Sequence, residues 1–173
     1  MDIPVLAIVG FSNSGKTTLM EKLIAALTAK GLYICTIKHS HHQPDMDTKG
    51  KDSWRHKQAG AKASLLVGSE QLLMVTDMPQ PLSPQEMAKK YFSDADLVLV
   101  EGYASMPCPK IEVMRAARST DLRCAGSDLL AVVTDMDDLD IHVPQLPLND
   151  VAQVVDFILQ WGNFHGREIY INT

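Results

Sequence analysis

The sequence predicts an α/β protein in which a mostly parallel central sheet is flanked by helices, an arrangement of three layers. Short apolar runs rich in β-branched residues alternate with helical patterns along the chain, which is the order of βαβ units. Two of these runs, 5–9 and 97–100, are apolar throughout, as strands in the middle of a parallel sheet are. A length of 173 residues suits one domain with a substantial core, so we interpret 1–173 as a single domain.

Each element is assigned from its local pattern. A strand is predicted where a β-branched apolar run lies between turn residues, and a helix where apolar residues recur every three or four positions. The runs at 64–68 and 72–76 surround a tight turn, which predicts a hairpin. The predicted strands are 5–9, 33–37, 64–68, 72–76, 97–100, 111–114 and 129–133, and the predicted helices are 16–30, 52–61, one that begins after Ser83 and one that begins after Asn149 or Asp150.

Capping residues support these helix boundaries. Gly31 follows the first helix, where a left-handed residue is favoured. Ser83 and Glu86 have the spacing of a capping box. Asn149 and Asp150 both have side chains that cap helix N-termini, so either can begin the last helix.

Charge and cysteine content exclude several classes of protein. Sixteen Lys and Arg residues against twenty-one Asp and Glu residues give a net charge of −5, which does not favour binding to nucleic acid or to an anionic membrane. No apolar run approaches the about 20 residues that cross a bilayer, and Asp2 stands where a signal peptide is basic. Cys35, Cys108 and Cys124 form no Cys-x-x-Cys pair, so no disulfide framework or zinc ribbon is predicted. We therefore expect a cytoplasmic protein.

One segment matches a motif with a clear physical basis. Residues 10–17 read Gly-Phe-Ser-Asn-Ser-Gly-Lys-Thr, which fits G-x-x-x-x-G-K-[ST] and lies between a predicted strand and a predicted helix. The glycines let backbone N–H groups turn toward phosphate oxygens, and the helix presents its positive end to the same anion. The sequence therefore predicts a P-loop NTPase-like fold that binds a nucleoside triphosphate. The candidate nucleotide-binding residues of this loop are Ser12, Asn13, Ser14, Gly15, Lys16, Thr17 and Thr18.

Catalysis and Mg²⁺ binding are assigned to three residues. We expect Lys16 to reach the β- and γ-phosphates and the Thr17 hydroxyl to bind Mg²⁺. Glu101 ends a buried strand, where a P-loop protein holds Mg²⁺ or its waters with an acidic residue. Because the residue is Glu rather than the commoner Asp, a water-mediated contact is favoured. Asp96 begins the same strand, at the other end of the sheet, and is expected to be structural.

Residues 39–51 are polar and predict a long surface loop, a kind of loop that is often functional. Their imidazoles and carboxylates could bind a transition metal, although no zinc spacing is present. Alternatively, the segment is a switch loop at the carboxyl edge of the sheet, with Lys38 on phosphate and Asp52 or Ser53 near Mg²⁺. A solvated loop is the third interpretation. The candidate metal ligands are His39, His41, His42, Asp45 and Asp47.

Asp135 is the candidate residue for recognition of the base. Guanine-specific P-loop proteins commonly carry Asn/Thr-Lys-x-Asp after a late strand, and here Thr134 and Asp135 follow the strand without that Lys. A contact from Asp135 to guanine and a turn-forming role are equally consistent with the pattern. No water-positioning glutamine or arginine finger is identified, so slow hydrolysis is expected.

Six segments together resemble the molybdopterin-guanine dinucleotide biosynthesis protein B (MobB) family. The most discriminating are Lys-His-Ser-His-His at 38–42 and Gly-Lys-Asp-Ser at 50–53. The similarity covers nearly the whole chain and fades at 79–94, at 103–109 and after Trp161. The six segments are 10–18, 37–42, 50–53, 59–61, 99–102 and 148–150.

This resemblance implies a GTP-binding accessory protein with low GTPase activity that forms a homodimer. Its implied partner is the molybdenum cofactor guanylyltransferase, which joins GMP to molybdopterin, and molybdopterin itself is a further candidate ligand. The implied cofactors are GTP and Mg²⁺, with the metal near Thr17 and Glu101. Gln43 and Pro44 depart from the family pattern, in which one acidic residue follows the His pair. The residues placed at the rim of the site are Lys38, Lys51 and Asp52.

Two other functions are compatible with the P-loop. A small-molecule or nucleotide kinase would share it but would usually carry an arginine-rich lid. The basic residues at 115, 118 and 123 alternate with Glu112 and Asp121, and we interpret this segment as a solvated loop. A non-enzymatic pterin-binding scaffold would not need the intact Lys16-Thr17 pair.

Overall fold

The computed structural model describes residues 3–40, 47–124 and 126–164. These residues form two compact units. The first contains the described residues up to His39 and from Ser83 onward, and the second contains those from Ser40 to Leu82. In chain order, the second unit is therefore an insertion into the first.

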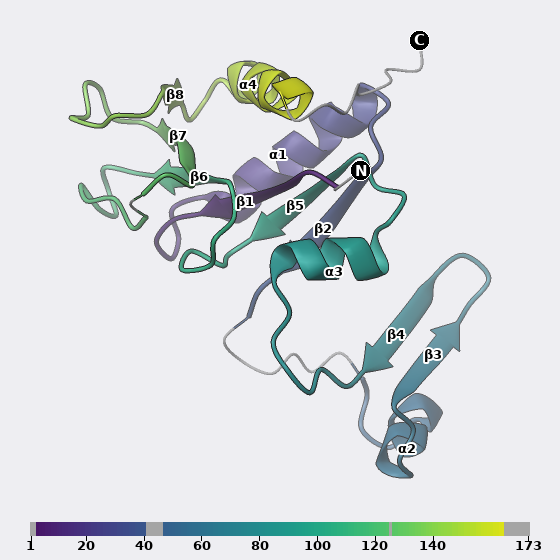
Figure 1. The fold of residues 1–173 in the computed structure, drawn as a ribbon. Helices are drawn as coiled ribbons and strands as arrows, with labels where there is room; N and C mark the ends of the chain where they lie inside the picture. The colour runs from purple at the N-terminus through teal and green to yellow at the C-terminus, as the bar shows by residue number, and fades with distance from the viewer. Residues whose placement is uncertain (1–2, 41–46, 125, 165–173) are drawn as a thin grey trace. The chain divides into compact units, whose positions relative to one another are not determined.

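The first unit contains a six-stranded sheet in the order β2-β5-β1-β6-β7-β8 (Figure 1). Each neighbouring pair of these strands is parallel. The carboxyl ends of the strands consequently lie along one edge of the sheet. The strands are β1 (Val5–Val9), β2 (Ile34–Lys38), β5 (Leu97–Glu101), β6 (Lys110–Met114), β7 (Leu129–Thr134) and β8 (Gln145–Pro147), and the helices of this unit are α1 (Lys16–Ala29), α3 (Pro84–Tyr91) and α4 (Val151–Phe164).

Alternate residues of β1 pack into opposite layers. Leu6 and Ile8 lie in a core cluster with residues of α1 and α4, whereas Val5 and Ala7 lie in a second cluster with Ala88 of α3. Successive side chains of a strand point to opposite faces, so a strand covered on both faces must be apolar throughout. Burial of each large side chain contributes up to about 1.5–3 kcal/mol. The predicted three-layer α/β fold is confirmed.

Two charged side chains of β6 are buried. The Lys110 ammonium donates hydrogen bonds to the carbonyl oxygens of Ala104, at 3.1 Å, and Met106, at 2.9 Å. The Glu112 carboxylate accepts hydrogen bonds from the backbone N–H groups of residues 123 and 124, at 2.7 and 2.8 Å. A buried charge is costly without such partners. These contacts hold the loop before β6 and the loop after β6 against the strand.

Most predicted boundaries agree with the structure to within one or two residues. The capping box is confirmed, since Ser83 Oγ accepts from the Glu86 N–H at 3.2 Å and a Glu86 carboxylate oxygen accepts from the Ser83 N–H at 2.7 Å. The Ser83 hydroxyl also donates to the Glu86 carboxylate at 2.8 Å. The hydrogen bonds from the Ser83 N–H and from this hydroxyl lower the pKa of Glu86, the backbone one most. Asp150 caps α4, because its Oδ1 accepts from the N–H of Gln153 at 3.1 Å. No helix among the described residues is long and apolar enough to span a membrane.

Strand β8 was not predicted from the sequence. It has three residues, of which Leu146 is buried, and it ends at Pro147. Three residues are too few for an alternating pattern, and proline is tolerated here because β8 lies at the edge of the sheet.

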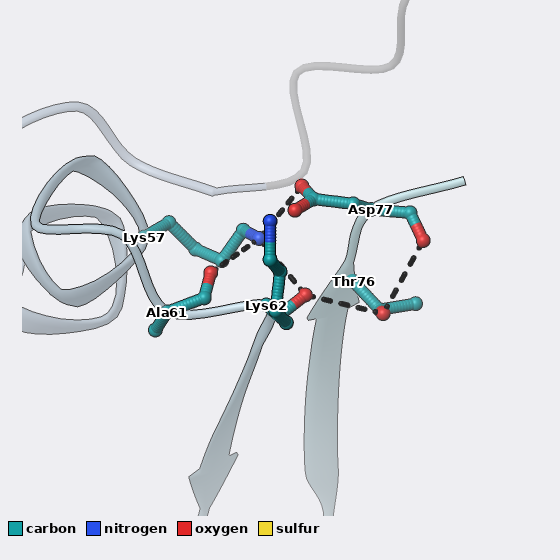
Figure 2. A network of polar contacts seen from close by, with 5 residues as sticks. All are labelled: Lys57, Ala61, Lys62, Thr76 and Asp77. Carbon is teal, nitrogen blue, oxygen red and sulfur yellow. Dashed lines mark hydrogen bonds and ion pairs between the residues drawn. The ribbon is translucent and has the colours of Figure 1, made fainter. Parts of the chain in front are cut away.

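The second unit consists of α2 (Asp52–Gln58) and the antiparallel hairpin β3 (Ala63–Val67) and β4 (Leu72–Thr76). Figure 2 shows how Lys57 joins the helix to the hairpin. Its ammonium donates to the carbonyl oxygens of Ala61 and Lys62, at 2.7 and 3.0 Å, and forms an ion pair with Asp77 at 2.7 Å. The hydrogen bond from Lys57 lowers the pKa of Asp77.

One face of this hairpin is apolar and exposed within the unit. Leu65 pairs with Met74 and Val67 pairs with Leu72, so the four side chains project from the same face. Val67 is 73% exposed and Leu72 is 66% exposed. An apolar face of this kind is typical of an interaction surface.

Replacement of Lys57 by Met should loosen the second unit. The substitution removes the donor to the Ala61 carbonyl oxygen and to the Asp77 carboxylate, and one of the donors to the Lys62 carbonyl oxygen. We therefore expect the opening free energy of the hairpin amides to fall by about 1–3 kcal/mol. Hydrogen exchange of β3 and β4 measures this change. Lys62→Met is the matched control, since the Lys62 side chain makes none of these hydrogen bonds. Equal loss of protection in both variants would contradict the role given to Lys57.

Candidate nucleotide-binding site

The loop between β1 and α1 has a backbone that requires its glycines. Gly10 has a φ of 140° and Gly15 a φ of 97°, both in the left-handed region. A Cβ atom built on Gly10 would lie 2.3 Å from the carbonyl oxygen of Val113 on β6, so no side chain fits there. Asn13 also has a positive φ, of 59°, which asparagine tolerates better than most residues. The predicted strand–loop–helix context of the motif is confirmed.

The beginning of α1 is suited to an anion. Gly15 is its N-cap, no side chain caps the helix, and no acidic residue lies in the first turn. The first N–H groups therefore have no side-chain acceptor, and the helix dipole favours negative charge at this end. The hydroxyl group of Ser14 is buried and makes no hydrogen bond to the described residues. A phosphate oxygen would supply the acceptor that these donors lack, so the loop fits a nucleotide phosphate.

Lys16 is half-buried beside this loop. Its ammonium donates a hydrogen bond to the carbonyl oxygen of Phe11 at 2.7 Å. Burial lowers the pKa of Lys16, the Glu101 carboxylate opposes this shift, and the cations Lys38 and Arg123 add to it. The ammonium is thus held within the loop by a single carbonyl, which a phosphate group could replace.

Glu101, Thr17 and Lys38 meet at the carboxyl edge of the sheet. Glu101 is 8% exposed, and its Oε1 accepts a hydrogen bond from Thr17 Oγ1 at 3.1 Å. The same oxygen forms a hydrogen-bonded ion pair with the ammonium of Lys38. These three residues line an open cleft together with residues of α1, including Glu21. The sequence predicted that Thr17 and Glu101 lie together, and the structure brings them into contact.

The donor set fits Mg²⁺. A hydroxyl group and a carboxylate are hard oxygen ligands, and Mg²⁺ in P-loop proteins takes few protein ligands beside phosphate oxygens and waters. Thr17 and Glu101 would hold the ion, directly or through water. Among the described residues, no group of three or more His, Cys, Asp and Glu side chains comes together as a metal site.

Two arginines that the sequence analysis assigned to a solvated loop lie against the P-loop. Arg123 Nη1 donates to the carbonyl oxygen of Gly10 at 3.4 Å, and its guanidinium carbon lies 5.6 Å from the ring centroid of Phe11. The guanidinium of Arg115 lies 3.7–3.8 Å from the position that a Cβ on Gly15 would occupy. The position of Arg115 directly after an apolar strand, at the same edge as the P-loop, is the sequence signal that could have found it.

Two aspartates lie at opposite ends of the sheet. Asp135 is exposed after β7, and its Oδ1 accepts a hydrogen bond from the backbone N–H of Ala116 at 2.9 Å. Asp96 precedes β5, and its Oδ2 accepts from the N–H of Tyr33 at 2.8 Å. The expectation that Asp96 is structural agrees with this contact. The contact of Asp135 is to the loop that follows β6.

The remaining candidates fall into three groups. Ser12, Asn13 and Thr18 are exposed on the P-loop and on the first turn of α1. Asp52 and Ser53 belong to the second unit, where Ser53 Oγ donates to Asp47 Oδ1 at 2.8 Å. The ring of His39 lies 4.2 Å from that of Tyr103. The predictions for His41, His42, Gln43, Pro44 and Asp45 concern residues outside the part of the chain that the structure describes.

Comparison with known proteins identifies the family. The family model described as "Molybdopterin guanine dinucleotide synthesis protein B" (MobB) matches residues 5–135. The chain belongs to the MobB family. A relative from Haemophilus influenzae is 42% identical over 166 residues, which are 95% of this chain and 93% of that protein. A relative from Escherichia coli is 36% identical over 164 residues, 92% of this chain and 93% of that protein. Both are named molybdopterin-guanine dinucleotide biosynthesis adapter protein.

Solved structures support the same assignment. The crystal structure of Bacillus subtilis MobB is 26% identical and superposes with a TM-score of 0.71, covering 91% of this chain and 97% of that one. A MobB homologue from Bacillus stearothermophilus is also 26% identical, with a TM-score of 0.66 and coverages of 92% and 98%. The family resemblance and the fold predicted from the sequence are therefore confirmed.

Glu101→Gln tests the metal role of this carboxylate. The amide oxygen can still accept from Thr17, but the charge that attracts Mg²⁺ is lost. If the site binds a nucleoside triphosphate with Mg²⁺, we expect the gain in nucleotide affinity on addition of Mg²⁺ to shrink by about tenfold, because a contact to a charged group is worth about 1.5–3 kcal/mol. Without Mg²⁺ the affinity should not fall, since a carboxylate near a polyanion has been removed.

Glu21→Gln is the matched control, because Glu21 lines the same cleft from α1. It should change the affinity equally with and without Mg²⁺. Titrations followed by calorimetry measure both quantities. Unaltered Mg²⁺ dependence in Glu101→Gln would remove this residue from the metal site.

Proposed function

We propose that this protein is a GTP-binding adapter in the synthesis of molybdopterin-guanine dinucleotide. It assists the guanylyltransferase that joins GMP to molybdopterin. Membership of the MobB family over most of the chain supports the pathway, and the names of the relatives from H. influenzae and E. coli support the adapter role. The observation that carries the nucleotide part is the P-loop, with its uncapped helix start and the unpartnered hydroxyl of Ser14.

In this proposal the loop residues 12–18 surround the phosphates of GTP. Backbone N–H groups and the Ser14 hydroxyl donate to phosphate oxygens, and Lys16 leaves the carbonyl oxygen of Phe11 to reach the β- and γ-phosphates. Thr17 and Glu101 would hold Mg²⁺, and the bound ion would neutralise phosphate charge. Lys38 is placed by its contact with Glu101 to approach the same phosphates.

Hydrolysis is proposed to be slow and to require Lys16 and Glu101. Glu101 would orient the attacking water, while Lys16 and the loop N–H groups stabilise the charge that develops on the phosphate oxygens. Glu101 already accepts hydrogen bonds from Thr17 and Lys38 on one oxygen, which supports a role in orientation. The protein therefore acts mainly by presenting bound nucleotide to its partner.

The proposed assembly is a cytoplasmic homodimer in which 1–173 act as one GTP-binding domain. The apolar hairpin face formed by Leu65, Val67, Leu72 and Met74 supports self-association, because exposure of these side chains to water is unfavourable.

Charge on this face should dissociate the dimer. Val67→Glu places a carboxylate among apolar neighbours, and we expect sedimentation at micromolar concentration to shift from dimer to monomer. Ser69→Glu, in the turn of the same hairpin, is the control that adds the same charge outside the face. A dimer that persists in Val67→Glu would exclude this surface.

Calorimetric titration with GTP and with ATP, each with Mg²⁺, tests the nucleotide part. We expect GTP to bind at least tenfold more tightly, a difference of about 1.4 kcal/mol. Lys16→Ala should abolish tight binding, whereas Lys22→Ala, on the exposed side of α1, should bind as the unaltered protein does. Equal affinities for the two nucleotides, or unchanged affinity in Lys16→Ala, would reject the proposal and direct attention to a kinase reaction.

A further inference from the structure

The segment Arg115–Cys124, here called the arginine loop, follows β6 and is tied down at its far end by a buried carboxylate. Glu112 is fully buried on β6 and accepts the backbone N–H groups of Arg123 and Cys124, one on each carboxylate oxygen. Two hydrogen bonds of this kind, one to each oxygen, hold the carboxylate and the loop backbone in a fixed position. The position of Arg123 is therefore set by the sheet.

The near end of the arginine loop is tied to β7. Asp135 accepts the N–H of Ala116 at 2.9 Å, and the carbonyl oxygen of Arg115 accepts the N–H groups of Arg118 and Ser119, at 2.8 and 3.1 Å. These contacts close a turn directly after Arg115. The two ends of the arginine loop are thus fixed by carboxylates, one within β6 and one directly after its parallel neighbour β7.

The two arginines at these ends lie against the P-loop. Arg123 donates to the carbonyl oxygen of Gly10 and lies over the ring of Phe11. Arg115 Nε, Cζ and Nη2 are nearly equidistant, at 3.7–3.8 Å, from the place of a Cβ on Gly15, which puts the guanidinium face-on above this glycine. Gly15 directly precedes Lys16, the residue that reaches the β- and γ-phosphates in P-loop proteins.

Arg115 has its donors available. Its side chain is exposed and forms no hydrogen bond or ion pair within the described parts of the chain. Arg123, Lys38 and Lys16 are further cations around the loop, and the first two lower the pKa of Lys16. This concentration of positive charge in a chain of net charge −5 is relieved by a polyanion.

We propose that Arg115 binds the terminal phosphate of a nucleoside triphosphate held in the P-loop, and that Glu112 and Asp135 position the loop that carries it. This inference rests on the proposed function, and it adds that the protein distinguishes triphosphate from diphosphate through a residue of its own chain. Arginine is suited to this role because its planar, permanently charged fork matches phosphate oxygens.

The test measures the affinities of Arg115→Ala for GDP and for a non-hydrolysable GTP analogue, both with Mg²⁺. We expect binding of the triphosphate to weaken by about tenfold, the worth of a hydrogen bond to a charged group, while GDP binding changes by less than about twofold. Arg115→Lys keeps the positive charge but not the planar guanidinium, so its affinity for the triphosphate should fall by less than that of Arg115→Ala. Arg118→Ala, which removes an exposed arginine of the same loop, should keep the ratio of the two affinities.

Three outcomes would overturn the inference or its basis. An Arg115→Ala ratio equal to that of Arg118→Ala, with Lys16→Ala still abolishing binding, overturns the role of Arg115 alone. Equal weakening of triphosphate and diphosphate means that Arg115 only stabilises the loop. Unchanged binding of both nucleotides in Lys16→Ala overturns the proposed function itself.

Asp135 offers an independent test of positioning. Asp135→Asn keeps an oxygen that can accept the N–H of Ala116, whereas Asp135→Ala removes it. We expect Asn to retain the triphosphate-to-diphosphate ratio and Ala to lower it. Loss of the preference for GTP over ATP in both variants, with an unchanged triphosphate-to-diphosphate ratio, would assign Asp135 to the guanine base and overturn its positioning role.

Discussion

The common direction of the strands is the constraint on which the candidate site depends. Because neighbouring strands of the large sheet are parallel, the residues after β1, β2, β5 and β6 come to one edge. Thr17 and Glu101 are 84 positions apart in the chain and yet share a hydrogen bond there. Apolar side chains of β1 and β5 pack into clusters on both faces of the sheet, and this packing holds the strand ends in register. The site therefore depends on the topology of the sheet as well as on the P-loop motif.

Contacts within the protein satisfy the two lysines of the site. Lys16 is satisfied by a carbonyl oxygen of its own loop, and Lys38 is neutralised by Glu101. Each of these contacts occupies a group that a nucleotide or a metal ion would need, so binding exchanges internal partners for external ones. Such an exchange costs little in desolvation, because the charges are already partly removed from water. Within the described parts of the chain, no carboxylate forms an ion pair with Arg115 or Arg123, which leaves this side of the site electropositive.

Local patterns predicted the fold well, because β1 and β5 are apolar and buried almost throughout and because α3 and α4 begin at recognisable caps. The P-loop and Glu101 were also found from the sequence, since both follow directly from strand ends in a known motif. The proximity of Arg115 and Arg123 was not found, because alternating charges in a loop indicate solvation when the contacts of its backbone are unseen. Glu112 lies within an otherwise apolar strand, and only the structure shows that its carboxylate accepts two backbone N–H groups. Strand β8 was not predicted because three residues are too few to show the alternation of apolar and polar side chains that indicates a strand.

The buried charges of β6 have a consequence for how this protein can change over time. Lys110 bonds to two carbonyl oxygens and Glu112 to two N–H groups, so both recognise main-chain atoms and ignore the side chains attached to them. The loops on either side of β6 can therefore exchange most of their amino acids and keep the same path. The backbone path of these loops therefore depends little on which side chains they carry. Substitutions in these loops can change the surface that a partner would recognise and still keep the backbone geometry around the P-loop.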